Sequence, residues 1–288
     1  MADLAIRLFG RFDASGGLRF GSARCRELLA LLLVKRSREC GNDYLIECLW
    51  PDERQPENAR HALNTELWRL RRAIDASAFS HAARIERSSA GLKLVLAPEV
   101  SIDLHRFADL IAELRAADAS GVPSDAARHI DELYDGDLLP EFYSDWALLA
   151  REAARNDYVF AMEHRLAEMM QLGKWQEAIH FARRVLRVEP LLEHVHRHIM
   201  LCHLRMSDRA AAILQYRELE RRLARELDCT PMPETVALFE SLEAGGEAPA
   251  FFAAADASLR FTPIARQLEQ AVTALAAAAD ALKRLDSA

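Results

Sequence analysis

The sequence predicts a mainly α-helical protein: an N-terminal winged helix of α+β type, then an α-helical repeat domain of the tetratricopeptide (TPR) kind, and a C-terminal helix. The first 97 residues read as strands, three helices and a hairpin, and the tract from residue 147 onward repeats with a period of 34 residues. Apolar residues near the C-terminus recur in heptads. We therefore expect a winged helix at 1–97, a helical domain at 98–243, a linker at 244–260 and a heptad helix at 261–286.

The composition describes a globular chain with enough apolar residues for two cores. Of its 288 residues 51% are hydrophobic, yet no stretch reaches the roughly 18 consecutive apolar residues that a membrane helix needs. Arg7 and Arg11 interrupt the only apolar run at the N-terminus, so no cleavable signal is expected. The five cysteines form an odd number without a CxxC pair, which fits a reducing compartment. We expect a cytoplasmic protein without a membrane partner.

Charge is distributed unevenly along the chain. The net charge is −7 overall, but residues 1–97 carry +4 and the remainder carries −11. A mildly basic front and an acidic rear favour phosphate binding by the first part and protein partners for the second.

The N-terminal part reads as a short hairpin followed by three helices. Residues 4–20 alternate apolar and polar around Ser15-Gly16-Gly17, which predicts two short strands with a glycine turn. Ser22 can cap a leucine-rich helix that ends before Gly41. A second helix, 43–50, is stopped by Pro51.

The third helix, 57–74, has two distinct faces. Leu63, Leu67, Leu70 and Ile74 form an apolar stripe that must be buried. Arg reads guanine and Asn reads adenine in the major groove, so the polar face suits DNA. A surface helix with a solvated charged side is the alternative. The polar face holds His61, Asn64, Thr65, Trp68, Arg69 and Arg72, with Glu66 as the acidic neighbour.

A hairpin around residues 88–91 completes a winged helix-turn-helix, and its basic residues are placed to contact sugar-phosphate or the minor groove. Trp68 is expected to pack on sugar or a thymine methyl, or alternatively to seal the helix against the hairpin. The expected DNA-binding residues are Arg60, His61, Asn64, Thr65, Trp68, Arg69, Arg71, Arg72, Arg84, Arg87 and Lys93.

This part resembles the OmpR-type winged helix, and more closely its form in the SARP/BTAD (bacterial transcriptional activator domain) regulators. The chain departs from the family at Leu92, where wings usually carry an aromatic residue, and at Glu66, which puts a negative charge where the family often faces DNA. Both departures bear on the wing contacts and the target sequence. The resemblance is carried by LFGRF at 8–12, RCRELLALLLV at 24–34, LIECLWPDE at 45–53, ARHALNTELWRLRRAI at 59–74 with its Leu70-Arg71-Arg72 tract, and GLKLVL at 91–96.

The rest of the chain up to residue 243 reads as helices in a repeat. A shift of 34 residues aligns Leu166-Ala167 with Met200-Leu201, Gly173 with Ser207 and Ala178 with Ala212, which is typical of TPR helix pairs. Pro190 and Pro231 follow the second helix of each repeat. Before the repeat, residues 103–114 and 125–134 show two shorter helical stripes.

This second part resembles the BTAD itself, through GDLLPEF at 136–142 with the Trp that follows it, and through the tract EPLLEHV to FESL at 189–242. The resemblance implies that the helical domain contacts RNA polymerase or a co-regulator, or holds two DNA-binding domains in tandem.

The C-terminal extension lies beyond the resemblance. Its apolar residues step by four and three, which favours a two-stranded coiled coil and hence a homodimer through 264–285, although a helix docking on its own TPR domain fits the same pattern. The seam consists of Ile264, Leu268, Ala271, Leu275, Ala278, Leu282 and Leu285.

Other chemistry has little support in the sequence. His194, His198 and Cys202 share one helix face at metal-ligand spacing, but no second cluster completes a shell, so they are weak candidates and no metal is expected. Arg217, Arg221 and Arg225 form a basic stripe amid glutamates, which favours a self-paired face over an anion or partner site. Nucleotide and hydrolase motifs are absent, so we expect neither a cofactor nor an enzyme.

These patterns together predict a sequence-specific DNA-binding transcriptional regulator, expected to be an activator, with double-stranded DNA and RNA polymerase or a co-regulator as partners. Glu66, Leu92 and the net charge of −7 favour the competing class, a TPR adaptor whose winged helix binds no DNA. A sensor that takes a ligand or metal in its TPR groove is the third.

Overall fold

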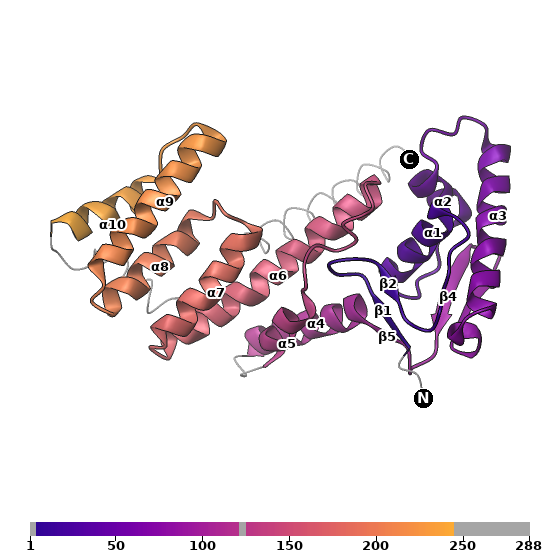
Figure 1. Ribbon diagram of the computed structural model, residues 1–288, viewed down its shortest axis with the longest axis horizontal. Coiled ribbons are helices and arrows are strands. Elements are labelled where there is room, and N and C mark those ends of the chain that lie inside the picture. Colours follow the sequence, from indigo (N-terminus) through magenta and orange to yellow (C-terminus); the bar gives the residue numbers. More distant parts are fainter. Residues whose placement is uncertain (1–3, 121–124, 245–288) are drawn as a thin grey trace, which may run out of the picture. The chain divides into compact units, whose positions relative to one another are not determined.

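The computed structural model describes residues 4–120 and 125–244, and the chain divides into two compact units, 1–155 and 156–288 (Figure 1). Each unit is described by itself. The expected linker beyond Ala244 and the heptad helix at 261–286 lie outside the described residues. None of the described helices is both long and apolar enough to span a membrane.

Unit 1 begins with the winged helix that the sequence predicts. Helices α1 (Ala23–Val34), α2 (Asn42–Leu49) and α3 (Pro56–Asp75) pack together, and β3 (Ala83–Arg87) pairs with β4 (Leu92–Leu96) as the wing, after a short 3-10 turn, η1 (Ala78–His81). Ser22 caps α1 as expected, because its hydroxyl accepts a hydrogen bond from the Cys25 amide at 3.0 Å. Six consecutive residues from Leu28 to Leu33 are buried, which makes α1 the central core helix.

The N-terminal strands correct one expectation. Strand β1 (Ala5–Arg7) pairs with β2 (Asp13–Ala14), so the chain reverses through residues 8–12, and Ser15-Gly16-Gly17 follows the hairpin instead of forming its turn. Gly10, at φ +74°, permits this reversal, and its amide donates to the Asp137 carbonyl at 3.0 Å. The local pattern could not show that a residue 127 positions away holds the turn.

The wing is fixed to the helical core at Gly91. Cys40 and Leu92 form an isolated bridge, and each amide donates to the other's carbonyl at 2.8–2.9 Å. Gly91 has φ +155°, and a Cβ there would lie 2.0 Å from the Cys40 carbonyl oxygen. Only glycine therefore fits at this position, which directly precedes β4, the second strand of the wing.

Unit 1 also includes the residues that follow the winged helix. Strand β5 (Ser101–Ile102) joins β1 in parallel, and helices α4 (Asp103–Ser120) and α5 (Ala126–Leu133) come next. The Asp103 carboxylate accepts hydrogen bonds from the amides of Leu8 at 2.7 Å and Phe9 at 3.0 Å. Phe9 also bridges to Leu138 and lies 5.0 Å from the ring of Phe107. The compact unit thus extends beyond the boundary expected at residue 97.

Helix α6 (Asp145–Gln171) begins in unit 1 and continues into unit 2, which holds α7 (Trp175–Val188), α8 (Glu193–Arg205), α9 (Arg209–Leu227) and α10 (Pro233–Glu243). Consecutive helices from α7 to α10 pack against each other. The helical residues aligned by the 34-residue shift are all buried: Leu166, Ala167, Ala178, Met200, Leu201 and Ala212.

The turns of the repeat confirm the alignment in a second way. Gly173, between α6 and α7, has φ +70°, and Ser207, between α8 and α9, has φ +61°. Both positions are left-handed, a conformation that favours glycine, so the serine occupies a glycine-type site. Pro190 follows α7 and Pro231 follows α9, as expected.

Candidate nucleic-acid interface

The two faces of α3 are as the sequence predicts. Leu63, Leu67, Leu70 and Ile74 are all at most 4% exposed, and the helix packs with this side against α1 and α2. The opposite side carries an exposed line of residues at i, i+3, i+7 and i+11, namely His61, Asn64, Trp68 and Arg72. Three of these side chains, those of His61, Asn64 and Arg72, end in planar polar groups of the kind that can form hydrogen bonds with base edges.

Trp68 and Arg72 form a pair on this face. The Arg72 guanidinium carbon lies 5.0 Å from the centroid of the Trp68 ring, a cation–π arrangement. The tryptophan is 57% exposed, which contradicts the alternative that it seals the helix against the wing. An apolar ring and a cation therefore stand together at the C-terminal half of the exposed face.

Glu66 does not lie on the exposed side of α3, which corrects the sequence expectation. It is 7% exposed, accepts a hydrogen bond from the Ser22 hydroxyl at 2.5 Å, and lies 2.6 Å from Nη1 of Arg69. The carboxylate thus links the start of α1 to α3. Its negative charge points into the fold and is neutralised there. Glu66 therefore gives no argument against DNA binding by the exposed side of α3.

Three of the expected DNA-binding arginines on α3 have hydrogen-bond or ion-pair partners inside unit 1. Arg69 pairs with Glu66, and Arg71 donates to the Ile85 carbonyl at 3.2 Å, which ties α3 to the wing. Arg60 lies 3.7 Å from Asp43 of α2, with both side chains well exposed. Arg69 and Arg71 therefore help to hold α3 in the fold, whereas Arg60 has only an exposed partner at the surface.

The wing meets α3 through one side-chain hydrogen bond. Nη1 of Arg87 donates to Oδ1 of Asn64 at 3.0 Å. Arginine only donates, so this contact fixes which end of the Asn64 amide is the oxygen and leaves the NH₂ group on the other side. The sequence does not indicate this link, because the two residues are 23 positions apart.

The remaining candidates are placed as follows. Thr65 donates its hydroxyl to the His61 carbonyl at 3.0 Å. Arg84 pairs with Glu86 at 2.8 Å, and Lys93 is half-buried opposite Glu86 in the hairpin register. Asn58 was not expected, yet it is exposed in the first turn of α3, three residues before His61. The same spacing, continued one turn toward the N-terminus, would have indicated it.

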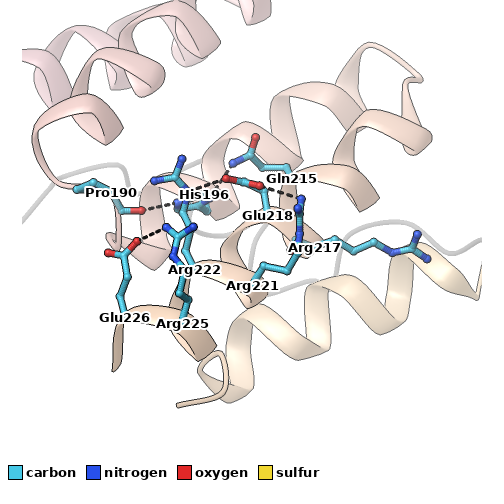
Figure 2. Close-up of polar contacts among 9 residues, drawn as sticks. All are labelled: Pro190, His196, Gln215, Arg217, Glu218, Arg221, Arg222, Arg225 and Glu226. Atoms are coloured by element: carbon cyan, nitrogen blue, oxygen red, sulfur yellow. Dashed lines mark hydrogen bonds and ion pairs between the residues drawn. The ribbon is translucent and has the colours of Figure 1, made fainter. Parts of the chain in front are cut away.

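The weak metal candidates lie in a packed region of unit 2. Nε2 of His194 is 2.6 Å from Oε1 of Glu163, and Cys202 is buried. Burial lowers the pKa of His198 to about 3. Among the described residues no group of three or more histidine, cysteine, aspartate and glutamate side chains is placed to hold a metal ion. His196 is equally internal, with Nε2 at 3.0 Å from the Pro190 carbonyl (Figure 2).

Two arginines of the α9 stripe, Arg221 and Arg225, are paired with glutamates, as Figure 2 shows. Glu218 accepts from Arg221 at 2.8 Å and from Arg222 at 2.7 Å, and Arg225 pairs with Glu226 at 2.6 Å. The hydrogen bond from Arg222 lowers the pKa of Glu218, so the carboxylate stays charged and the pairs persist. This arrangement favours the self-paired interpretation.

The chain is similar to known regulators of transcription. The profile of the family described as "Bacterial transcriptional activator domain" matches residues 102–243. The transcriptional regulatory protein MoaR1 of Mycobacterium tuberculosis is 25% identical over 229 residues, 78% of this chain and 73% of MoaR1. The regulatory protein AfsR of Streptomyces coelicolor is 29% identical over 219 residues, 75% of this chain but only 21% of AfsR.

A solved structure has the same fold. Mycobacterium tuberculosis EmbR, in complex with a low affinity phosphopeptide, matches with a TM-score of 0.68 and 21% sequence identity, over 89% of this chain and 69% of that chain. This match confirms the mainly helical architecture with an N-terminal winged helix. The relatives are transcriptional regulators and not enzymes. The chain therefore belongs to the SARP family of regulators that carry a bacterial transcriptional activator domain, and it is a regulator of transcription.

Proposed function

We propose that this regulator binds duplex DNA in a sequence-specific manner, with α3 in the major groove and the β3–β4 hairpin on the adjacent backbone. The observation that carries the proposal is the exposed line on α3, joined to the wing by the Arg87–Asn64 hydrogen bond. Winged helices present their third helix and wing to DNA in this way. The inward position of Glu66 supports the proposal, because the exposed line then carries no acidic group.

We further propose that the helical domain recruits RNA polymerase or a co-regulator, so that the protein acts as an activator in the bacterial cytoplasm. The description of the matching family as a transcriptional activator domain supports this role. Residues 1–97 have a net charge of only +4, so one winged helix gains little from phosphate neutralisation. A second copy, held through residues 264–285, would supply the missing affinity.

The test is a selection of binding sites from random duplexes, at about 50 and about 200 mM salt, with wild type and Arg60→Ala/Arg72→Ala. Wild type should recover a sequence motif, as a direct repeat if two copies bind in tandem. Each arginine contributes about 1 kcal/mol, so the double variant should bind the recovered site about 30-fold more weakly. If both arginines contact phosphates, its plot of log affinity against log salt should be flatter by about 2.

The matched control is Arg217→Ala/Arg221→Ala on α9, which removes the same charge from unit 2. It should retain the wild-type site and affinity. If wild type recovers no motif, and low-salt retention is equal in both double variants, α3 does not read DNA and the adaptor function takes its place.

The wing contact gives a second prediction. Arg87→Ala removes a cation from the hairpin and the restraint on Asn64, so binding should weaken about fivefold, with weaker discrimination at one base position. A double-mutant cycle of Arg87→Ala with Asn64→Ala on the recovered duplex should show a coupling of about 1 kcal/mol. Arg84→Ala, whose residue pairs with Glu86 within the hairpin, should show no coupling to Asn64.

A further inference from the structure

Unit 1 contains a cavity that the DNA-binding face does not use. It has a volume of about 750 Å³ and lies between α1, α2 and the first turns of α6. Its wall includes Leu31 and Val34 of α1, Tyr44 of α2, and Trp146 and Leu149 of α6. Among the described residues, none that lines this cavity belongs to α3. The cavity is therefore separate from the proposed DNA-binding face.

The volume of this cavity lies in the range of small-molecule sites, about 300–1,000 Å³, and its wall combines apolar and aromatic side chains with five charged ones. Large apolar side chains at the cavity stay open to solvent: Tyr143 is 79% exposed and Leu149 is 72% exposed. Exposed apolar side chains gathered at one concave place mark a binding surface more often than a solvated one.

Trp146 supplies an aromatic part of the wall. The side chain is only 8% exposed, and its Nε1 has no hydrogen-bond partner among the described residues. Its Nε1 is also closed to water, so an oxygen atom in the cavity does not reach it, and Trp146 contributes ring surface to the wall.

The charges around the cavity restrict the ligand further. Two cationic side chains, Arg24 and Lys35, already have partners: Arg24 pairs with Glu27 at 2.6 Å, and Lys35 lies 4.6 Å from the centroid of the Tyr44 ring. Three carboxylates also line the cavity, namely Glu47, Asp52 and Asp145. This balance disfavours a phosphate or another multiply anionic ligand.

We propose that this cavity binds a small, planar, largely apolar molecule, and that it gives the regulator a site for a signal molecule apart from α3. The occupant is neutral or singly charged. The aromatic walls stack on its rings, and the carboxylates remain in water at the edge.

Nile red is a suitable probe, because it is neutral, planar and fluorescent in apolar surroundings. Wild type should bind it saturably, at one dye per chain. Leu149→Glu puts a charge into the apolar wall and should weaken binding at least about tenfold, whereas Leu148→Glu changes the preceding residue, which does not line the cavity, and should leave it unchanged.

Cysteine alkylation places the dye on the molecule. Cys48 lines the cavity and is half-buried, while Cys229 is exposed in unit 2. Saturating Nile red should slow iodoacetamide modification of Cys48 at least about threefold, relative to Cys229 in the same sample. Equal dye affinity in Leu149→Glu and wild type, or a Cys48 rate that does not change with dye, would overturn the proposal.

Discussion

Replacing Asp103 with leucine is expected to lower the free energy of unfolding of unit 1 by about 3–5 kcal/mol. One carboxylate oxygen accepts from the amides of Leu8 and Phe9, and the other accepts from the Leu104 amide at 2.7 Å. Leu8 and Phe9 are 0% and 2% exposed, so water cannot replace the lost acceptor at their amides. Urea unfolding, followed by hydrogen exchange of peptides from residues 4–155, measures the loss.

Two variants of α4 separate this effect from a general change in charge. Asp103→Asn keeps one acceptor oxygen and should lose about 1–2 kcal/mol. Asp109→Leu removes an exposed carboxylate that pairs with Arg36, and surface pairs contribute only about 0–1 kcal/mol. An Asp103→Leu protein as stable as wild type would mean that residues 4–97 fold without the segment that follows, and the domain boundary expected at residue 97 would then describe the folding unit.

The second large effect is a loss of stability of unit 2 in acid. Burial, together with the charges of His194 and Arg197, lowers the pKa of His198 from 6.5 to about 3. In the unfolded chain His198 takes up a proton near pH 6.5, whereas in the folded protein the ring stays neutral down to about pH 3. The contribution of the neutral ring to the stability of unit 2 is therefore complete above pH 6.5 and is lost as the pH falls toward 3. Linkage gives a loss of about 2 kcal/mol at pH 5 and about 3 kcal/mol at pH 4.

Denaturant unfolding of His198→Leu and wild type at about pH 7, 5 and 4 tests this expectation, with hydrogen exchange of unit 2 peptides as the readout. The stability difference between the two proteins should shift in favour of the variant as the pH falls. Burial also lowers the pKa of His196 and of His203, so the variant should retain part of the pH dependence. His180→Leu, at an exposed position on α7, is the matched control. Parallel pH profiles for wild type and His198→Leu would contradict the assignment.

The periodic parts of the molecule were predictable from the sequence. A helix buries residues that recur every three or four positions, so the stripe from Leu63 to Ile74 could be assigned to the core without knowing its neighbours. The repeat also predicted a backbone conformation. Aligning Gly173 with Ser207 placed a serine at a glycine-type turn position, and Ser207 adopts the left-handed backbone conformation there. Both inferences rest on regularities within a few turns of chain.

The unpredicted parts depend on contacts between distant residues. Whether a glutamate on a helix points to solvent or inward depends on its partner, and for Glu66 that partner is Ser22, 44 residues earlier. The N-terminal turn is held by Asp137 and Leu138, which no local pattern around Gly10 could show. The Arg87–Asn64 contact likewise needs the hairpin and α3 in place before it can form.

That contact affects the entropy of recognition. An arginine and an asparagine that would each lose about 0.5–1.5 kcal/mol of rotamer freedom on docking have already lost part of it within the unbound protein. Under the proposed DNA binding, this loss of freedom occurs once, on folding, and is not repeated at each encounter with a duplex. A DNA-binding face that is ordered in this way should gain in residence time on the duplex more than in rate of association. Most affinity differences between related complexes lie in the dissociation rate.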